Sequence, residues 1–112
     1  MAVFNGELYF GYESDVGGAG YVRKINLTTG IITTIAGTGE GFSGDGGPAV
    51  NAQLRAAHAI CFGPDGSLYV GDDDRIRKID PNGIITTIAG TGQSGHSGDG
   101  GQAINAQIED PN

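Results

Sequence analysis

Residues 30–39 read GIITTIAGTG, and the same ten letters occur again at residues 83–92. The motif SGDGG follows each copy, at 43–47 and at 97–101. The starting positions of these two motif pairs differ by 53 and 54 residues, because one residue is inserted in the second copy. A repeat of about 50 residues is typical of a β-propeller blade, in which four strands form one sheet. The sequence therefore predicts two blade-like units.

Turn signals divide each repeat into four short apolar segments. Gly, Asn, Asp and Pro cluster between the segments, and Asn82-Gly83 is a strong tight-hairpin signal because both residues tolerate positive φ. In the first repeat the expected strands are AVF at 2–4, ELYF at 7–10, YVRKIN at 21–26 and IITTIAG at 31–37, with a loop at 11–20. In the second repeat they are AICF at 59–62, SLYV at 67–70, RIRKID at 75–80 and IITTIAG at 84–90, with GDDD at 71–74 as a loop.

The predicted fold class is all-β, with two four-stranded antiparallel propeller blades in the chain. No stretch sustains the spacing of an amphipathic helix, so helix is expected to be minor. The expected divisions are a first blade at 1–41, an inter-blade loop at 42–57, a second blade at 58–92 and a junction segment at 93–112.

The composition excludes several classes of protein. The net charge is −7, with only six Lys and Arg in 112 residues, so a phosphate-binding surface and a nucleic-acid partner are not expected. No apolar run approaches the ~20 residues of a membrane helix. The start MAVFNGELYF lacks a signal peptide, which predicts a cytoplasmic chain as written. Cys61 is the single cysteine, which excludes an intrachain disulfide, and its place in AICF predicts a buried position.

The motifs GIITTIAGTG, GFSGDGGPA, AQL, LYV and RIRKID together resemble the NHL-repeat β-propellers, specifically their bacterial branch rich in FSGDGG loops. The resemblance covers nearly the whole chain, twice over, and implies a propeller that usually has six blades. Longer members of the family are often extracytoplasmic. The chain departs from the family in having two blades, and in LRAAH at 54–58 where the family commonly has Pro, although Pro111 keeps one.

The segment NAQIEDPN at 105–112 suggests how chains join. Placed before Met1, it reproduces the passage from NAQLRAAH at 51–58 into AICF. Two blades bury one interface and leave two apolar sheet faces open. If each face exposes roughly several hundred Å², then at ~25 cal/mol/Å² the burial that is not realised amounts to about 10 kcal/mol per interface. We therefore expect a head-to-tail homo-oligomer that closes into a ring, with a trimer of six blades favoured and a tetramer possible. An excerpt of a longer propeller and an engineered fragment are the alternatives.

The loops that join the second strand to the third, and one blade to the next, share one face of a propeller. Ligands of propellers usually bind on such a face, near the central channel. The candidate binding residues there are Tyr12, Glu13, Asp15, Phe42, Asp45, His58, Asp72, Asp73, Asp74, His96 and Asp99.

The acidic candidates each have a structural interpretation beside the functional one. Asp45 and Asp99, in the SGDGG loops, are expected to accept nearby backbone N–H groups, and a bound cation or sugar hydroxyl is the alternative. Their spacing does not match the EF-hand calcium loop. The GDDD segment at 71–74 is expected to be a solvated turn with one residue capping locally. Clustering of its copies around the axis of a ring would make a cation site. Whether a metal binds stays open at this point.

The remaining candidates have packing roles beside possible ligand contacts. Phe42 is expected to fill space between the blades, and Arg75 and Arg77 are expected to bridge them. His58 and His96 lie in different loops, and the sequence pairs neither of them.

We expect a non-catalytic scaffold or binding module, with no cofactor and with a protein or carbohydrate as its ligand. No Ser–His–Asp arrangement, phosphate-binding glycine loop or exposed nucleophilic cysteine is indicated. The alternative is a metal-dependent hydrolase or lyase with its site at the propeller channel. The resemblance allows this alternative, because some NHL relatives are enzymes that hold a metal in a His-rich propeller centre. The expected innermost strands AVF and AICF supply no histidine for such a centre.

Overall fold

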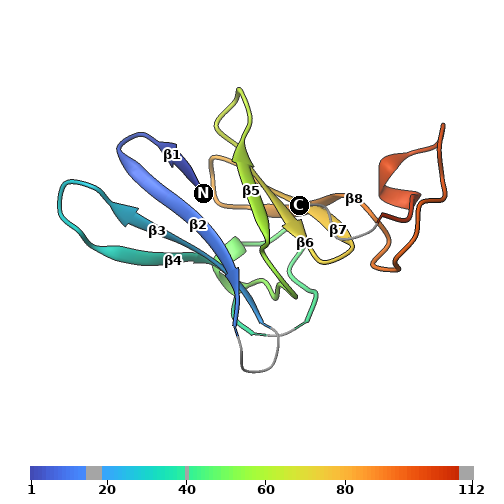
Figure 1. Cartoon of the computed structure of the whole chain (residues 1–112), viewed down its shortest axis with the longest axis horizontal. Helices are drawn as coiled ribbons and strands as arrows, with labels where there is room; N and C mark the ends of the chain where they lie inside the picture. Colours follow the sequence, from blue (N-terminus) through green and yellow to red (C-terminus); the bar gives the residue numbers. More distant parts are fainter. Residues whose placement is uncertain (15–18, 40, 109–112) are drawn as a thin grey trace.

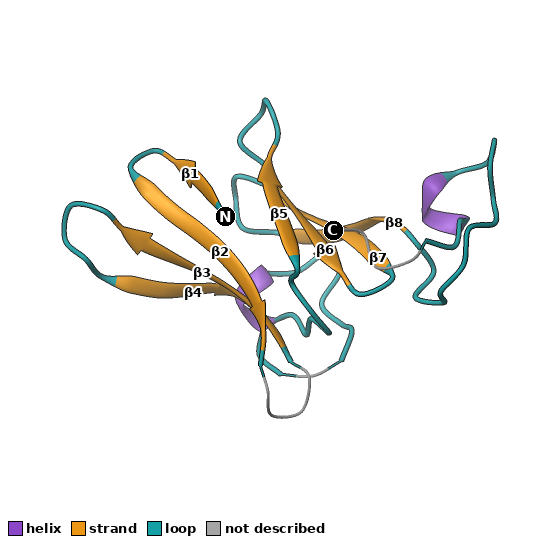
Figure 2. Ribbon diagram, viewed as in Figure 1, coloured by secondary structure: helices purple, strands orange, loops and turns teal. Residues whose placement is uncertain are grey.

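The computed structural model describes residues 1–14, 19–39 and 41–108, and these form two four-stranded antiparallel sheets (Figures 1 and 2). The first sheet contains β1 (Ala2–Phe4), β2 (Glu7–Glu13), β3 (Gly20–Asn26) and β4 (Ile32–Ala36) in that order. The second contains β5 (Ala59–Phe62), β6 (Leu68–Asp72), β7 (Arg75–Ile79) and β8 (Ile85–Ala89). Two short 3₁₀ helices follow the sheets, η1 (Ala49–Asn51) and η2 (Ala103–Asn105). The predicted all-β class with two four-stranded antiparallel sheets is confirmed. None of these described helices has the length and apolar character needed to cross a membrane.

Two strands are longer than the sequence predicts. β2 continues through Glu13, where a loop was expected, because Gly11 pairs with Val22 and Tyr12 pairs with Tyr21 on β3. β6 likewise continues to Asp72, which pairs with Arg75. The GDDD loop is thereby reduced to a two-residue turn.

A tight turn closes the β1–β2 hairpin, at the end of the sheet opposite to Glu13. Asn5 and Gly6 join β1 to β2 with φ angles of 51° and 76°. Positive φ at both central residues is the requirement of the two-residue hairpin turn whose twist matches the flanking strands. Asn5-Gly6 therefore forms this turn, whereas at Asn82-Gly83 only Gly83 has a positive φ, of 82°, and its N–H donates to the carbonyl of Asp80 at 2.9 Å.

The hydrophobic core lies where the two sheets face each other. The second sheet buries Leu68, Val70, Ile79 and Ile85 there, and Val22 of the first sheet is fully buried among them. Aromatic rings extend this contact toward the turns. The rings of Phe4 and Phe62 stack with centroids 4.5 Å apart, and the ring of Tyr9 meets Phe62 edge-on at 4.8 Å.

The loop at 42–57 is bound to both sheets (Figure 1, green). Its Gly46 donates to the carbonyl of Ile85 on β8 at 2.7 Å, and Ile85 donates back to Gly47 at 3.0 Å. At its other end, the carbonyl of Leu54 accepts from the N–H of Gly20 on β3 at 2.8 Å. This loop therefore ties the first sheet to the outer strand of the second.

The outward faces of the two sheets remain uncovered by any described segment. Val3 on the first sheet is 65% exposed. On the second sheet, an apolar hollow is lined by Ala59, Ile60, Cys61, Tyr69, Val70, Gly71 and Ile76. Cys61 is exposed, so the prediction that it is buried is wrong. The AICF pattern correctly indicated an apolar face, and Cys61 is exposed because nothing described covers that face.

Candidate functional site

A fully buried arginine holds the loop at 42–57 in place. The guanidinium of Arg77 donates through Nη1 to the carbonyl of Gln53 and through Nη2 to the carbonyl of Ser43, each at 2.8 Å. Nη2 also donates to Oδ1 of Asp45 at 2.8 Å. Hydrogen bonds to an ionised group are about twice as strong as neutral ones, and the planar guanidinium suits several acceptors at once. Arg77 was expected to bridge the two blades, but these contacts join β7 to the loop at 42–57 and do not reach the first sheet directly.

Asp72 is the buried carboxylate of the same junction. Its Oδ1 accepts the backbone N–H groups of Arg55 at 2.8 Å and of Ala56 at 3.0 Å. Its Oδ2 lies 3.5 Å from Nη1 of Arg77. Burial raises the pKa of Asp72, and the two N–H groups and Arg77 oppose that shift only in part. Asp72 is therefore a structural anchor for the loop. It is buried rather than solvated, and the N–H groups that it accepts lie 16 and 17 residues away rather than within its own turn.

Phe42 lies under the arginines of β7. The guanidinium carbon of Arg75 is 3.6 Å from the centroid of the Phe42 ring, and that of Arg77 is 4.6 Å away. Both distances are within the range of a cation–π contact. The ring face of Phe42 is thus occupied by protein, but its ring contacts are with the second sheet alone and the residue is 36% exposed, so it does not fill the space between the blades as expected.

The other predicted residues fall into separate places. Nε2 of His58 and Oε2 of Glu13 lie 3.0 Å apart, and the rings of Tyr12 and Tyr21 are tilted against each other with centroids 5.7 Å apart. Asp73 and Asp74 form the β6–β7 turn, and Asp15 lies outside the described residues. His96 and Asp99 belong to the segment at 93–108, which lies beyond β8 on the side away from the first sheet (Figure 1, orange to red). The candidates therefore form no single cluster.

The aspartates of the two SGDGG loops differ from expectation. Backbone N–H groups were expected as their partners, but Asp45 binds the side chain of Arg77 instead. No hydrogen bond or ion pair to the carboxylate of Asp99 occurs within the described part of the chain. Among residues 1–14, 19–39 and 41–108, no three His, Cys, Asp or Glu side chains come close enough together to hold a metal ion.

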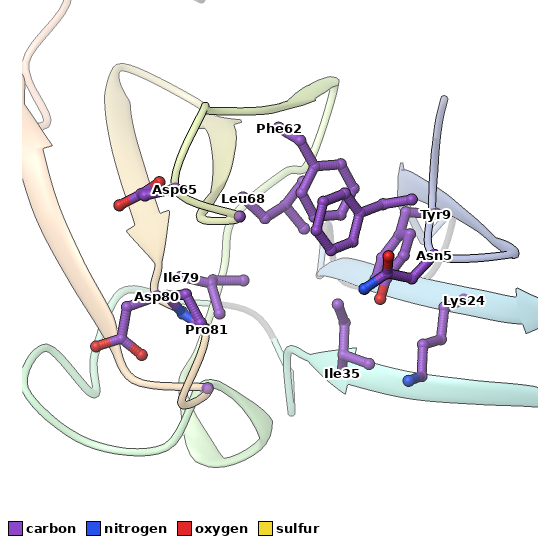
Figure 3. A pocket seen from close by; sticks show the side chains of 13 residues that line it. Asn5, Tyr9, Lys24, Ile35, Phe62, Asp65, Leu68, Ile79, Asp80 and Pro81 are labelled. Carbon is purple, nitrogen blue, oxygen red and sulfur yellow. The ribbon is translucent and has the colours of Figure 1, made fainter.

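A cleft between the sheets, at the end that carries the tight turns, was missed by sequence reasoning (Figure 3). It has a volume of about 480 Å³. Its walls are aromatic and aliphatic, with polar groups at the rim. The lining residues are Phe4, Asn5, Tyr9, Lys24, Ile35, Phe62, Asp65, Gly66, Leu68, Ile79, Asp80, Pro81 and Gly83.

The polar groups of the cleft are of two kinds. Asp65 and Asp80 are engaged with their own turns, and the N–H and hydroxyl of Ser67 lower the pKa of Asp65. Lys24 is paired with Glu7 at 3.1 Å, and burial raises the pKa of the Tyr9 hydroxyl. A cleft with aromatic and aliphatic walls, and with a hydroxyl and an amide among its lining groups, suits a ligand that has both apolar surface and hydroxyls. The signal in the sequence was weak, because Phe4 and Phe62 meet only after folding.

Two consecutive four-stranded antiparallel sheets, joined by a loop that is bonded to both, define a β-propeller-type domain. The chain belongs to the Teneurin NHL domain family, whose model matches residues 29–94. The predicted resemblance to NHL proteins is confirmed at this level.

Several teneurins are similar in sequence. Teneurin-3 of Mus musculus is 36% identical over 92 residues, which cover 71% of this chain and 3% of the relative. Teneurin-1 of Homo sapiens is 46% identical over 62 residues, covering 52% of this chain and 2% of the relative. Teneurin-1 of Gallus gallus is 40% identical over 67 residues, which cover 54% of this chain and 2% of the relative. The chain thus spans only a small fraction of the length of these relatives.

Proposed function

We propose that this protein is a non-catalytic binding module of the NHL propeller type, and that its blade pair completes a ring with further copies of itself. A cyclic trimer supplies the six blades usual for the family, and the FSGDGG loop supports placing the chain in the bacterial branch. The proposal divides the chain into blades at 1–41 and 58–92, a loop at 42–57 and a junction segment at 93–112, of which 109–112 lie outside the described residues.

The observation that carries this proposal is the pair of open sheet faces. Inside the chain, the face of the first sheet that carries Tyr9 and Val22 packs against the second sheet. The corresponding residues of the second sheet are Tyr69 and Ile76, and they line the uncovered apolar hollow. A large exposed apolar face on a small domain marks an interaction surface. The Tyr69 and Ile76 face of one copy is therefore expected to pack against the first sheet of the next copy, as the Tyr9 and Val22 face packs against the second sheet within the chain.

We expect the purified chain to have a native mass three times its 11.4 kDa. Burial of the two apolar faces drives the association, and a heterologous contact that closes gives a ring of defined size. Sedimentation or native mass spectrometry over a dilution series measures this mass. A well-folded species that keeps the mass of one chain at all concentrations contradicts the proposed assembly.

The ligand site that we propose is the cleft lined by Phe4, Tyr9 and Phe62, with a carbohydrate as its ligand. Stacking of a sugar on the aromatic rings, with hydroxyls bonded to Tyr9 and Asn5, matches the composition of the cleft. Titration with soluble oligosaccharides should shift the NMR amide signals of Asn5 and Gly66. The signals of His58 and Asp73, at the other end of the sheets, serve as the control. Shifts confined to those control residues contradict this choice of face.

A further inference from the structure

The segment at 97–107 repeats the sequence of the segment at 43–53 at nine of eleven positions, with similar backbone geometry, but no described arginine is bound in it. In both, a glycine N–H closes the same turn at 3.0 Å, from Gly47 to Gly44 and from Gly101 to Gly98. The turn glycines have similar φ angles, 84° at Gly46 and 85° at Gly100. The loop therefore adopts its bound shape without the interaction that the first copy makes.

The first copy of this loop is the receptor for Arg77. Its acceptors are the carbonyls of Ser43 and Gln53 and the carboxylate of Asp45. The counterparts in the second copy are Ser97, Gln107 and Asp99.

In the second copy, a hollow of about 310 Å³ lies beside the residues that correspond to the Arg77 acceptors. Its lining residues are Gly95, His96, Ser97, Asp99, Ala106, Gln107 and Ile108. Asp99 is exposed, and no described basic side chain reaches it. The hollow therefore has the acceptors that a guanidinium requires, and nothing described fills it.

The arginine that matches this hollow is Arg23. It pairs with Phe10 across β2 and β3, as Arg77 pairs with Val70 across β6 and β7. The Nε atoms of both arginines are buried without a hydrogen-bond partner. The difference lies at the terminal nitrogens, which donate to the loop in Arg77 and have no acceptor among the described residues in Arg23. A half-buried guanidinium without acceptors is costly, and a partner that supplies them is favoured.

The outer strands show the same asymmetry by an independent measure. Ile85 on β8 is fully buried, because Gly46 and Gly47 bond to its backbone. Ile32 occupies the same place in the identical sequence of β4 and is 42% exposed. The edge of β4 thus offers free backbone groups to a segment such as 100–101, as edge strands do.

We infer that the segment at 97–107 of one copy receives Arg23 of the next copy, with bonds from its guanidinium to the carbonyls of Ser97 and Gln107 and to the carboxylate of Asp99. Gly100 and Gly101 then pair with Ile32 along β4. This inference rests on the proposed head-to-tail assembly and names the contact that sets its direction and register. Arginine suits the hollow better than lysine, because its planar fork addresses three fixed acceptors at once.

The test compares two identical substitutions in the two copies of the loop. Asp99→Ala removes the carboxylate at the junction between chains, and we expect it to raise the dissociation constant about 10- to 100-fold per interface. Asp45→Ala makes the same change inside the chain, so we expect it to lower the urea midpoint of unfolding and to change the dissociation constant much less. Arg23→Met removes the guanidinium itself and should weaken association at least as much as Asp99→Ala does.

A gain-of-affinity variant strengthens the test. His96 stands where the first copy has Phe42, whose ring contacts the arginines. His96→Phe is expected to tighten association about 2- to 5-fold, by supplying the missing cation–π contact to Arg23. Dissociation constants come from sedimentation over a dilution series.

The outcomes separate the inference from the proposal on which it rests. If the wild type forms the ring and both Asp99→Ala and Arg23→Met have the same dissociation constant as the wild type, the inferred Arg23 contact is wrong and the proposed assembly stands. If the wild type keeps the mass of one chain throughout, both are wrong. Weaker association in these two variants but not in Asp45→Ala supports the contact.

Discussion

Replacing Arg77 with methionine is expected to lower the free energy of unfolding by about 3–5 kcal/mol, which approaches the whole stability of a small domain. Methionine fills much of the same volume but donates no hydrogen bond. The carbonyls of Ser43 and Gln53 lose their donor, and the buried carboxylate of Asp72 loses its nearby positive charge. Because the loop at 42–57 binds both sheets, its release also uncovers the core. Urea unfolding followed by circular dichroism measures the loss.

Arg23→Met is the matched control for this substitution. Arg23 occupies the equivalent position in the first sheet and makes no described hydrogen bond through its guanidinium. At the lowest usable chain concentration, where association contributes least to apparent stability, its effect on unfolding should be small. Equal losses in Arg77→Met and Arg23→Met would show that the contacts of Arg77 with the loop add nothing to stability.

The strands and turns could be predicted because their signals are local. The repeated apolar segments between Gly, Asn and Pro residues predict the positions of the eight strands that the structure describes, and Asn5-Gly6 forms the turn that its chemistry requires. The errors are at strand ends. β2 and β6 extend to Glu13 and Asp72 because pairing with the neighbouring strand continues beyond the apolar run.

The junction network could not be predicted because its contacts are distant in sequence. Asp45 and Arg77 are 32 residues apart, and the N–H groups bound by Asp72 are 16 and 17 residues away. An aspartate in GDDD or SGDGG has the local pattern of a solvated turn residue, and only the fold decides which carboxylate is buried. The cleft escaped notice for the same reason, since its rings come from two different sheets.

Identical sequences have different environments in the two repeats. IITTIA on β8 buries its first strand residue, Ile85, whereas the same letters on β4 leave Ile32 exposed. Intrinsic propensity and local pattern are equal in the two copies, so the difference comes from what precedes each blade. The second blade has the loop at 42–57 before it, and the first has no described segment in that place. Sequence analysis of a repeat therefore predicts the shared structure and not the unequal burial.

Replacing Asp72 with alanine is expected to lower the free energy of unfolding by about 2–5 kcal/mol, because two buried backbone N–H groups lose their acceptor at about 1–3 kcal/mol each. These groups belong to Arg55 and Ala56, where the loop returns to the second sheet. Asp72→Asn keeps a carbonyl oxygen in the position of Oδ1, so it should lose far less. Equal losses in the two variants would show that acceptance of these N–H groups is not what Asp72 contributes.

The comparison of Asp72→Asn with the wild type should also depend on pH. Burial raises the pKa of Asp72 above its ordinary value of 3.8, so the folded state holds the proton more tightly than the unfolded state does. A group of this kind contributes stability below its unfolded pKa and loses that contribution as the pH rises through its folded pKa. The amide of the Asp72→Asn variant does not titrate, so the wild type should lose stability relative to this variant from pH 3.8 upward. Urea midpoints of both proteins, measured from below that pH to neutrality, test the sign. If the stability of the wild type instead increases relative to that of Asp72→Asn with rising pH, the favourable contacts of the carboxylate with Arg77 and the two N–H groups outweigh the cost of burying its charge.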